Sequence, residues 1–254
     1  MMSSAAFLYK EFKEILRTPK IIILPAVFTF FGILSPLTGR YMNEILAFSL
    51  KGQMEIKLPE STYFDSYGQF FKNLTSICII IVILTFMGTV TDEKTRGSAA
   101  LILTKCVSRA NFILGKFFAC TSLFTFAYVL SIAVCLYYTY FLFHIFLIPN
   151  LWLSLLMFWI YGIFIISITI FASILGKSTM TAAVLSFLGF VAISFLTFIP
   201  YVGKYTPGSL SNLCMEVLTG VKAAEQALYP IIATAVLTIF TIISSIFVFK
   251  RQEI

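Results

Sequence analysis

Long apolar runs alternate with short polar segments along this 254-residue chain. A helix needs about 20 apolar residues to cross a bilayer. Runs of roughly that length cover residues 21–37, 74–90, 117–143, 151–175, 179–200 and 229–249. The pattern predicts an all-α integral membrane protein with six transmembrane helices in a single domain, residues 1–254. Only Gly176-Lys177-Ser178 separates the fourth run from the fifth, which predicts a tight helical hairpin.

An amphipathic stretch, residues 7–20, precedes the first crossing. Its apolar residues recur at helical spacing on one face, and these are Leu8, Phe12, Ile15 and Leu16. Charged residues fill the rest of the turn, namely Lys10, Glu11, Lys13, Glu14 and Arg17. A helix of this kind lies in the plane of the membrane interface.

The segment 92–109 is the longest connection that we predict on the cytosolic side. It opens with Asp92-Glu93, closes with Ser108-Arg109, and has a short apolar run from Ala99 to Leu103. That run is too short to cross a bilayer. It predicts either a short helix that docks against the membrane or a partner, or an ordinary positive loop that only sets orientation.

Two segments are predicted on the outer side. Residues 38–73 mix charged and apolar residues, with a short helix expected near 43–50. In residues 201–228, Thr206-Pro207 is a helix start, and Gly220 can end the helix. The apolar residues of that helix recur at helical spacing, at Leu210, Leu213, Val217 and Leu218. A second short helix is expected at 221–228, and both short helices are expected to dip into the outer leaflet or lie on it.

Charge orients the chain. With the N-terminus inside, two thirds of the 18 Lys and Arg residues lie on the cytosolic side, while acidic residues divide almost evenly, so the net charge of +7 lies inside. This is the positive-inside pattern of a multi-pass protein of the cytoplasmic membrane, with both termini cytosolic. The basic balance is thereby explained without nucleic acid.

The sequence lacks residues that several classes of membrane protein require. No ionisable residue stands in the middle of a predicted crossing, which argues against a proton-coupled carrier or an intramembrane hydrolase. The five cysteines form no C-x-x-C pair, and His144 is alone, so neither a disulfide nor a metal site is expected. Cys214 is expected to be a free thiol on the outer side. The chain has no phosphate-binding loop, so driven transport would take its energy from another chain.

A resemblance rests on residues around the 92–109 segment. These are Glu93-x-x-Arg96-Gly97-Ser98, Leu101 and Leu103, Ser108-Arg109, and Gly115-Lys116 before the third crossing. The pattern resembles the permease subunits of type-2 ABC exporters (ABC-2 transporters). It departs from that family at Cys106, where the family often has proline.

The resemblance implies a non-catalytic membrane subunit without cofactors. Two copies of a separate ATPase would hold ATP and Mg²⁺, and a second permease chain would complete a homo- or heterodimer. Residues 97–104 would form a coupling helix in an ATPase groove, with Glu93 and Arg96 at its rim. The amphipathic helix, including Phe12, Ile15, Leu16 and Arg17, would be the elbow helix.

Some alternatives stay open. Glu93 and Arg96 are three residues apart, so they can pair with each other instead of with a partner. The cargo implied by crossings without deep charge is apolar or amphipathic: a peptide, an antimicrobial compound or a lipid-like molecule. The rival functions are a membrane binding, immunity or scaffold protein, and a facilitative channel.

Overall fold

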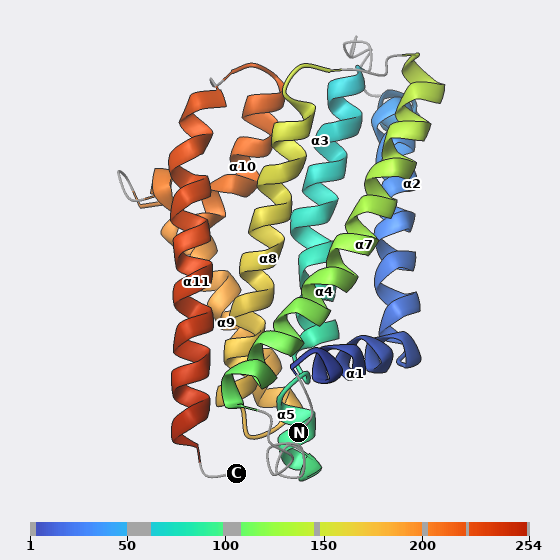
Figure 1. Cartoon of the computed structure of the whole chain (residues 1–254). Coiled ribbons are helices and arrows are strands. Elements are labelled where there is room, and N and C mark those ends of the chain that lie inside the picture. The colour runs from blue at the N-terminus through green and yellow to red at the C-terminus, as the bar shows by residue number, and fades with distance from the viewer. Residues whose placement is uncertain are drawn as a thin grey trace.

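The computed structural model describes residues 4–49, 62–98, 108–144, 148–199, 203–221 and 224–252. These residues form helices and the turns that connect them, without a strand. Six helices are long and apolar enough to cross a membrane: Lys20–Met42, Tyr63–Thr95, Arg109–Phe143, Leu151–Leu175, Thr179–Leu196 and Glu225–Arg251. The prediction of an all-α protein with six membrane-spanning helices is confirmed (Figure 1).

The helices run up and down in one bundle, with α1 (Ser4–Arg17) lying across its lower end. The first crossing is α2 (Lys20–Ser49). The second consists of α3 (Tyr63–Asn73), a π-helical turn (Leu74–Cys78) and α4 (Ile79–Phe86), and a short helix α5 (Thr91–Thr95) follows it. The others are α7 (Arg109–Phe143), α8 (Leu151–Leu175), α9 (Thr179–Leu196) and α11 (Leu228–Arg251). Between the last two lies α10 (Pro207–Leu218).

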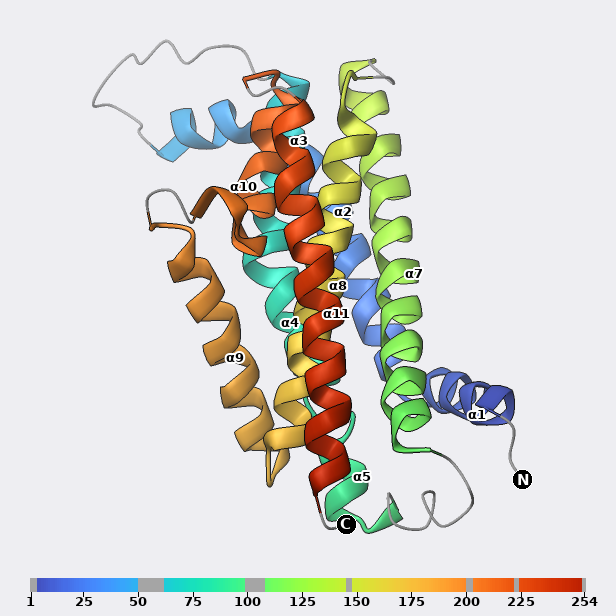
Figure 2. The same cartoon turned by 60° about the vertical axis from the view of Figure 1, so that its left-hand side comes forward.

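Several crossings extend beyond their apolar runs. The helix expected near 43–50 is formed as far as Ser49, but it is the continuation of α2 and not a short helix of its own. Pro36 lies inside α2 and removes one helical hydrogen bond. The last part of α2 turns away from the bundle axis (Figure 2). At the other end of the outer segment, Thr62 and Asp65 form a capping box that starts α3 eleven residues earlier than hydropathy alone predicts.

The core of the bundle centres on α8. In its most apolar window 67% of the residues are buried inside the protein, against 11% in α9 and 17% in α11. Gly162 of α8 lets the ring of Phe124 approach, since a Cβ at Gly162 would lie 2.2 Å from that ring. Tyr128 of α7 donates its hydroxyl proton to the Leu155 carbonyl at 2.8 Å, which satisfies a polar group at membrane depth.

The predicted helix after Pro207 is confirmed. Thr206 is its N-cap residue, Pro207 is in its first turn, and Gly220 follows its end with φ of +73°. Its four periodic apolar residues are all buried. Of the second expected helix, 221–228, the described part from residue 224 is a 3₁₀ turn at Ala224–Ala227 that leads directly into α11, and not a separate α-helix.

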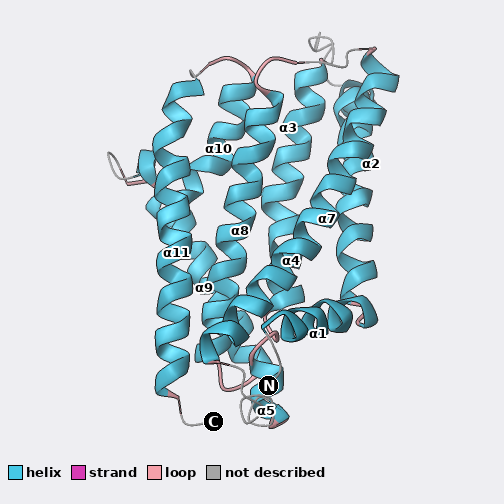
Figure 3. Ribbon diagram, viewed as in Figure 1, coloured by secondary structure: helices cyan, strands magenta, loops and turns pink. Residues whose placement is uncertain are grey.

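The buried face of α10 packs against α8, α3 and α11, so this helix is part of the bundle and not a surface addition (Figure 3). Cys214 lies on that face. It is a free thiol, as predicted, but it is fully buried and donates its S–H to the Leu210 carbonyl at 2.9 Å.

Candidate functional site

At the lower end of the bundle, the start of helix α5 is hydrogen-bonded to the end of α8 and to the start of α9. The backbone N–H groups of Val90 and Thr91 both donate to the Ser173 hydroxyl oxygen, at 3.0 and 3.1 Å. The Thr179 hydroxyl donates to the Asp92 carboxylate at 2.6 Å. The start of the 92–109 segment is therefore held in place by a hydrogen-bonded connection to two membrane helices.

A buried lysine lies next to this connection. Lys116 stands two turns inside α7 and is only 2% exposed. Its ammonium lies 2.9 Å from Glu93 Oε1 and 3.1 Å from Glu11 Oε2. Glu93 belongs to α5 and Glu11 to α1, so one cation joins three helices that are distant in sequence.

Lys10 completes the group at the surface. Its ammonium lies 3.0 Å from Glu11, 2.7 Å from Glu14 and 3.3 Å from Glu93. We call Lys10, Glu11, Glu14, Glu93 and Lys116 the ionic cluster. A buried charge is costly unless it is paired, so these ion pairs fix the relative positions of α1, α5 and α7.

The two exposed members of the ionic cluster have shifted pKa values. Burial alone would lower the pKa of Lys10, but its hydrogen bond to Glu14 and the charges of Glu11 and Glu93 raise it. Burial would raise the pKa of Glu14, but the hydrogen bond from Lys10 and the charge of Lys116 hold it below its usual value. Both groups are therefore charged at neutral pH. Lys10 attracts Glu93 of α5 and Glu14 is attracted to Lys116 of α7, and these attractions help to hold α1 to the bundle.

Apolar contacts also dock α1. Phe7 is 1% exposed, and its ring occupies the space that a side chain at Gly115 would need, since a Cβ there would lie 2.7 Å from the Phe7 ring. The opposite side of the helix is open: Phe12 is 40% exposed and Leu16 62%. The sequence pattern placed Glu11 on the outer polar face of the helix. This is wrong, because Glu11 is only 4% exposed and its carboxylate is paired with Lys116 inside the protein.

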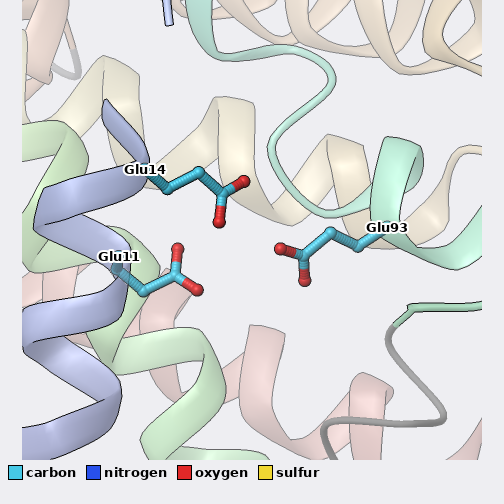
Figure 4. Close-up of side chains that lie close together, drawn as sticks. All are labelled: Glu11, Glu14 and Glu93. Carbon is cyan, nitrogen blue, oxygen red and sulfur yellow. The ribbon is translucent and has the colours of Figure 1, made fainter. Parts of the chain in front are cut away.

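The carboxylates of Glu11, Glu14 and Glu93 converge on one point (Figure 4). Their oxygens lie within 4.8 Å of one another, and Glu93 Oε2 has no hydrogen-bond partner among the described residues. Three carboxylates are a ligand set for a hard divalent ion. Here, however, the Lys10 ammonium already contacts all three, and the Lys116 ammonium contacts two. The carboxylates are neutralised by lysine, and we assign no metal to them.

A cavity of about 500 Å³ opens beside the ionic cluster, between α1, the start of the 92–109 segment and α7. Its lining includes Asp92, Arg96 and Ser98 as well as all five members of the cluster. The polar groups at the lower end of the molecule thus gather around one recess.

A sequence profile of the ABC-2 family transporter proteins matches residues 5–254. This chain belongs to the ABC-2 transporter family. It is also similar to the "uncharacterized transmembrane protein YxlG" of Bacillus subtilis (strain 168), with 25% identity over 255 residues that cover 98% of this chain and 97% of that protein. As an ABC-2 protein it is a multi-pass membrane protein, and its family implies a membrane subunit that associates with an ABC ATPase.

The structure places most residues of the predicted coupling interface of this ABC-2 protein. Arg96 and Gly97 are exposed, and Gly97 has φ of +71° at the end of α5. Ser98 donates its hydroxyl to the Glu93 carbonyl at 3.3 Å. Glu93 itself points inward and pairs with lysines, and no ion pair joins it to Arg96. Leu101 and Leu103 lie outside the described residues.

The end of the segment has structural partners. Ser108 is the N-cap of α7, and its hydroxyl oxygen accepts the backbone N–H of Asn111 at 3.1 Å. Arg109 reaches the end of α11, where its Nη1 contacts three backbone carbonyls. Residues that the ABC-2 pattern predicts together at one interface are therefore divided between exposed positions and internal anchors.

Sequence reasoning missed Lys10, Glu11 and Lys116 as members of a site. The one available signal was the Gly115-Lys116 pair, because a lysine beside a glycine at the entrance of a crossing has close neighbours to pair with. Their identification needed the fold, since Lys116 and Glu11 are 105 residues apart.

Proposed function

We propose that this chain is the membrane-spanning subunit of an ATP-driven exporter and that the ionic cluster transmits motion from the ATPase to the membrane helices. The observation that carries this proposal is the double ion pair of Lys116, which binds Glu93 of α5 and Glu11 of α1. Because α5 begins the 92–109 segment, a displacement of that segment moves α1 and α7 as well.

The transmission follows from rigidity. A packed and ion-paired junction has discrete arrangements and does not deform continuously, so a push at one point shifts the attached helices together. In this proposal residues 97–104 sit in a groove of the ATPase, with Arg96 and Gly97 facing it. Glu93 does not contact the ATPase but links the segment to Lys10 and Lys116 within the protein. The elbow helix at the membrane interface is α1, with Phe12, Ile15, Leu16 and Arg17.

The remaining features of the proposal follow the same scheme. The lower end of the bundle faces the cytosol, as the excess of Lys and Arg there favours. Two permease chains and two ATPase subunits form the transporter, with ATP and Mg²⁺ in the ATPases.

The cargo is apolar or amphipathic, such as a peptide, an antimicrobial compound or a lipid-like molecule. Charged residues of the described crossings lie toward the helix ends, and α8 and α9 have none, which supports such a cargo.

The experiment is co-purification. The chain is expressed with each ABC-type ATPase of its host in turn, and each purified complex is assayed for stoichiometry and ATP hydrolysis. We expect one ATPase to form a stable complex, and Leu101→Asp with Leu103→Asp to abolish it without affecting membrane insertion. Val221→Asp is the control for an added carboxylate, since it places one negative charge at an exposed position at the opposite end of the bundle.

The outcomes separate the rival functions. A complex that survives the double substitution removes the coupling-helix assignment. Failure of every ATPase to bind the unaltered chain overturns the exporter proposal and favours a scaffold or immunity protein. Cargo movement without any ATPase favours a facilitative channel.

A further inference from the structure

The C-terminal end of α11 lies against both ends of the 92–109 segment. Arg109 Nη1, at the far end of the segment, is 3.0, 2.7 and 2.9 Å from the carbonyl oxygens of Phe249, Lys250 and Gln252. At the near end, the Lys94 ammonium donates to Gln252 Oε1 at 2.9 Å. Residues that are 158 positions apart in the chain thus meet at one turn.

The same turn is hydrogen-bonded to the end of α8. Lys94 also donates to the Ile174 carbonyl at 2.8 Å, and Gln252 Nε2 donates to that same carbonyl at 3.1 Å. Gln252 therefore accepts from the segment with its amide oxygen and donates to the hairpin with its amide nitrogen. Both halves of one side chain are used, which specifies its orientation.

An aromatic stack supports the contact. Phe249 is fully buried and lies parallel to Phe112 of α7, with ring centroids 5.2 Å apart and an interplanar angle of 1°. Phe112 in turn contacts Phe7 of α1, with centroids 5.7 Å apart. The end of α11 is therefore packed against the bundle, and carbonyls of its last turn accept hydrogen bonds from Arg109.

The chemistry suits a helix end. The last four carbonyls of a helix have no partner within the helix and carry partial negative charge. A guanidinium is a favourable partner for them because it is permanently charged and presents several donors in a fixed plane. Lys94 has no carboxylate within ion-pair distance among the described residues, and its ammonium donates instead to the Ile174 carbonyl and to the amide oxygen of Gln252.

We infer that Lys94, Arg109 and Gln252 form a clasp that sets the orientation of the 92–109 segment for its partner. They are positioning residues, and the C-terminal turn is part of the coupling apparatus. This inference rests on the proposed function for its consequence, but its geometry concerns this chain alone. With the clasp open, the segment samples more orientations, and a partner that selects one of them binds more weakly.

The first test needs no ATPase. Spin labels are attached to cysteines at the exposed positions Thr95 and Arg251 in a Cys106→Ser background, where the other four cysteines are buried. Double electron–electron resonance on the protein in nanodiscs is expected to give one narrow distribution of distances between the two labels. Arg109→Gln and Gln252→Ala should each broaden it. Lys250→Gln is the matched control, because it removes one positive charge from the same turn while leaving its backbone carbonyl for Arg109. Unchanged widths, or equal broadening in the control, overturn the clasp.

The second test uses the ATPase from the co-purification. Arg109→Gln is expected to weaken the apparent affinity for the ATPase about tenfold, the effect of losing hydrogen bonds from a charged donor. ATP turnover at saturating ATPase should stay near that of the unaltered chain, and Arg109→Lys should restore part of the affinity. Broad distance distributions with unaltered affinity overturn the positioning role. If no ATPase binds the unaltered chain, the exporter proposal fails, and the distance measurement still decides whether the clasp exists.

Discussion

The ammonium of Lys116 lies 3.1 Å from the carboxylate of Glu11, although 105 residues separate the two in sequence. Both side chains are almost fully buried, and the pair joins a helix that lies across the bundle to a helix that crosses it. The stability of this end of the protein therefore depends on charges that are largely shielded from bulk water.

Removing the cation should be severely destabilising. Lys116→Met leaves Glu11 and Glu93 buried with Lys10 as their remaining partner, and breaking a buried ion pair costs about 3–5 kcal/mol. We expect a large fall in the thermal unfolding midpoint of the protein in detergent. The triple variant Lys116→Met, Glu11→Gln, Glu93→Gln should recover part of the loss because the orphaned charges are gone. A midpoint for Lys116→Met equal to that of the parent would show that the cluster is not a stabilising feature.

The contact between Phe7 and Gly115 makes a second prediction. Gly115→Val should push the Phe7 ring out of its site and destabilise the docking of α1 by about 1–3 kcal/mol, as overpacking does. Hydrogen exchange of backbone amides in α1 should accelerate. Leu114→Val, a β-branched substitution one position earlier on the same helix, is the control. Adding Phe7→Ala to Gly115→Val should relieve the clash, and failure to do so would locate the effect elsewhere.

The attachment of α1 should depend on pH in a defined direction. The pKa of Glu14 is lowered in the folded protein, so its contribution is complete above its ordinary value of 4.5 and is lost as pH falls through the lower folded-state value. The cations that face it are Lys10, Lys20 and Lys116, and the carboxylates of Glu11 and Glu93 lie beside it. The difference in unfolding midpoint between the parent and Glu14→Gln should be constant near neutral pH and shrink in acid. A difference that increases toward acid would contradict this assignment.

Cys214 should be unreactive in the folded protein. Burial raises the pKa of its thiol, so little thiolate forms, and the side chain has no exposed surface. In a variant that retains only this cysteine, a membrane-impermeant maleimide should fail to label it in intact cells and label it fully after denaturation in SDS. Rapid labelling without denaturant would show that α10 separates from α8 in the membrane.

The sequence by itself determined the number of crossings and the hairpin between α8 and α9, through hydropathy, and the helix that starts at Pro207, through its end residues and periodicity. These features are local, because each depends on the length of an apolar run or on the residues at a helix end. Their boundaries were less well predicted. Polar residues such as Asp65 and Arg109 continue helices that hydropathy ends earlier, since a helix needs no apolar side chains where it leaves the bilayer.

The functional residues divide in the same way. The motif from Glu93 to Arg109 is contiguous, so the sequence located the segment, but not which of its side chains face inward. Glu93 pairs with Lys116 and Lys10, and Arg109 binds the end of α11, because the fold brings those partners to them. The apolar pattern of α1 predicted its amphipathic character but put Glu11 outside. Only the tertiary structure decided that, because the docking of α1 removes Glu11 from water, and Lys116 of a neighbouring helix then offsets the loss of hydration of its carboxylate.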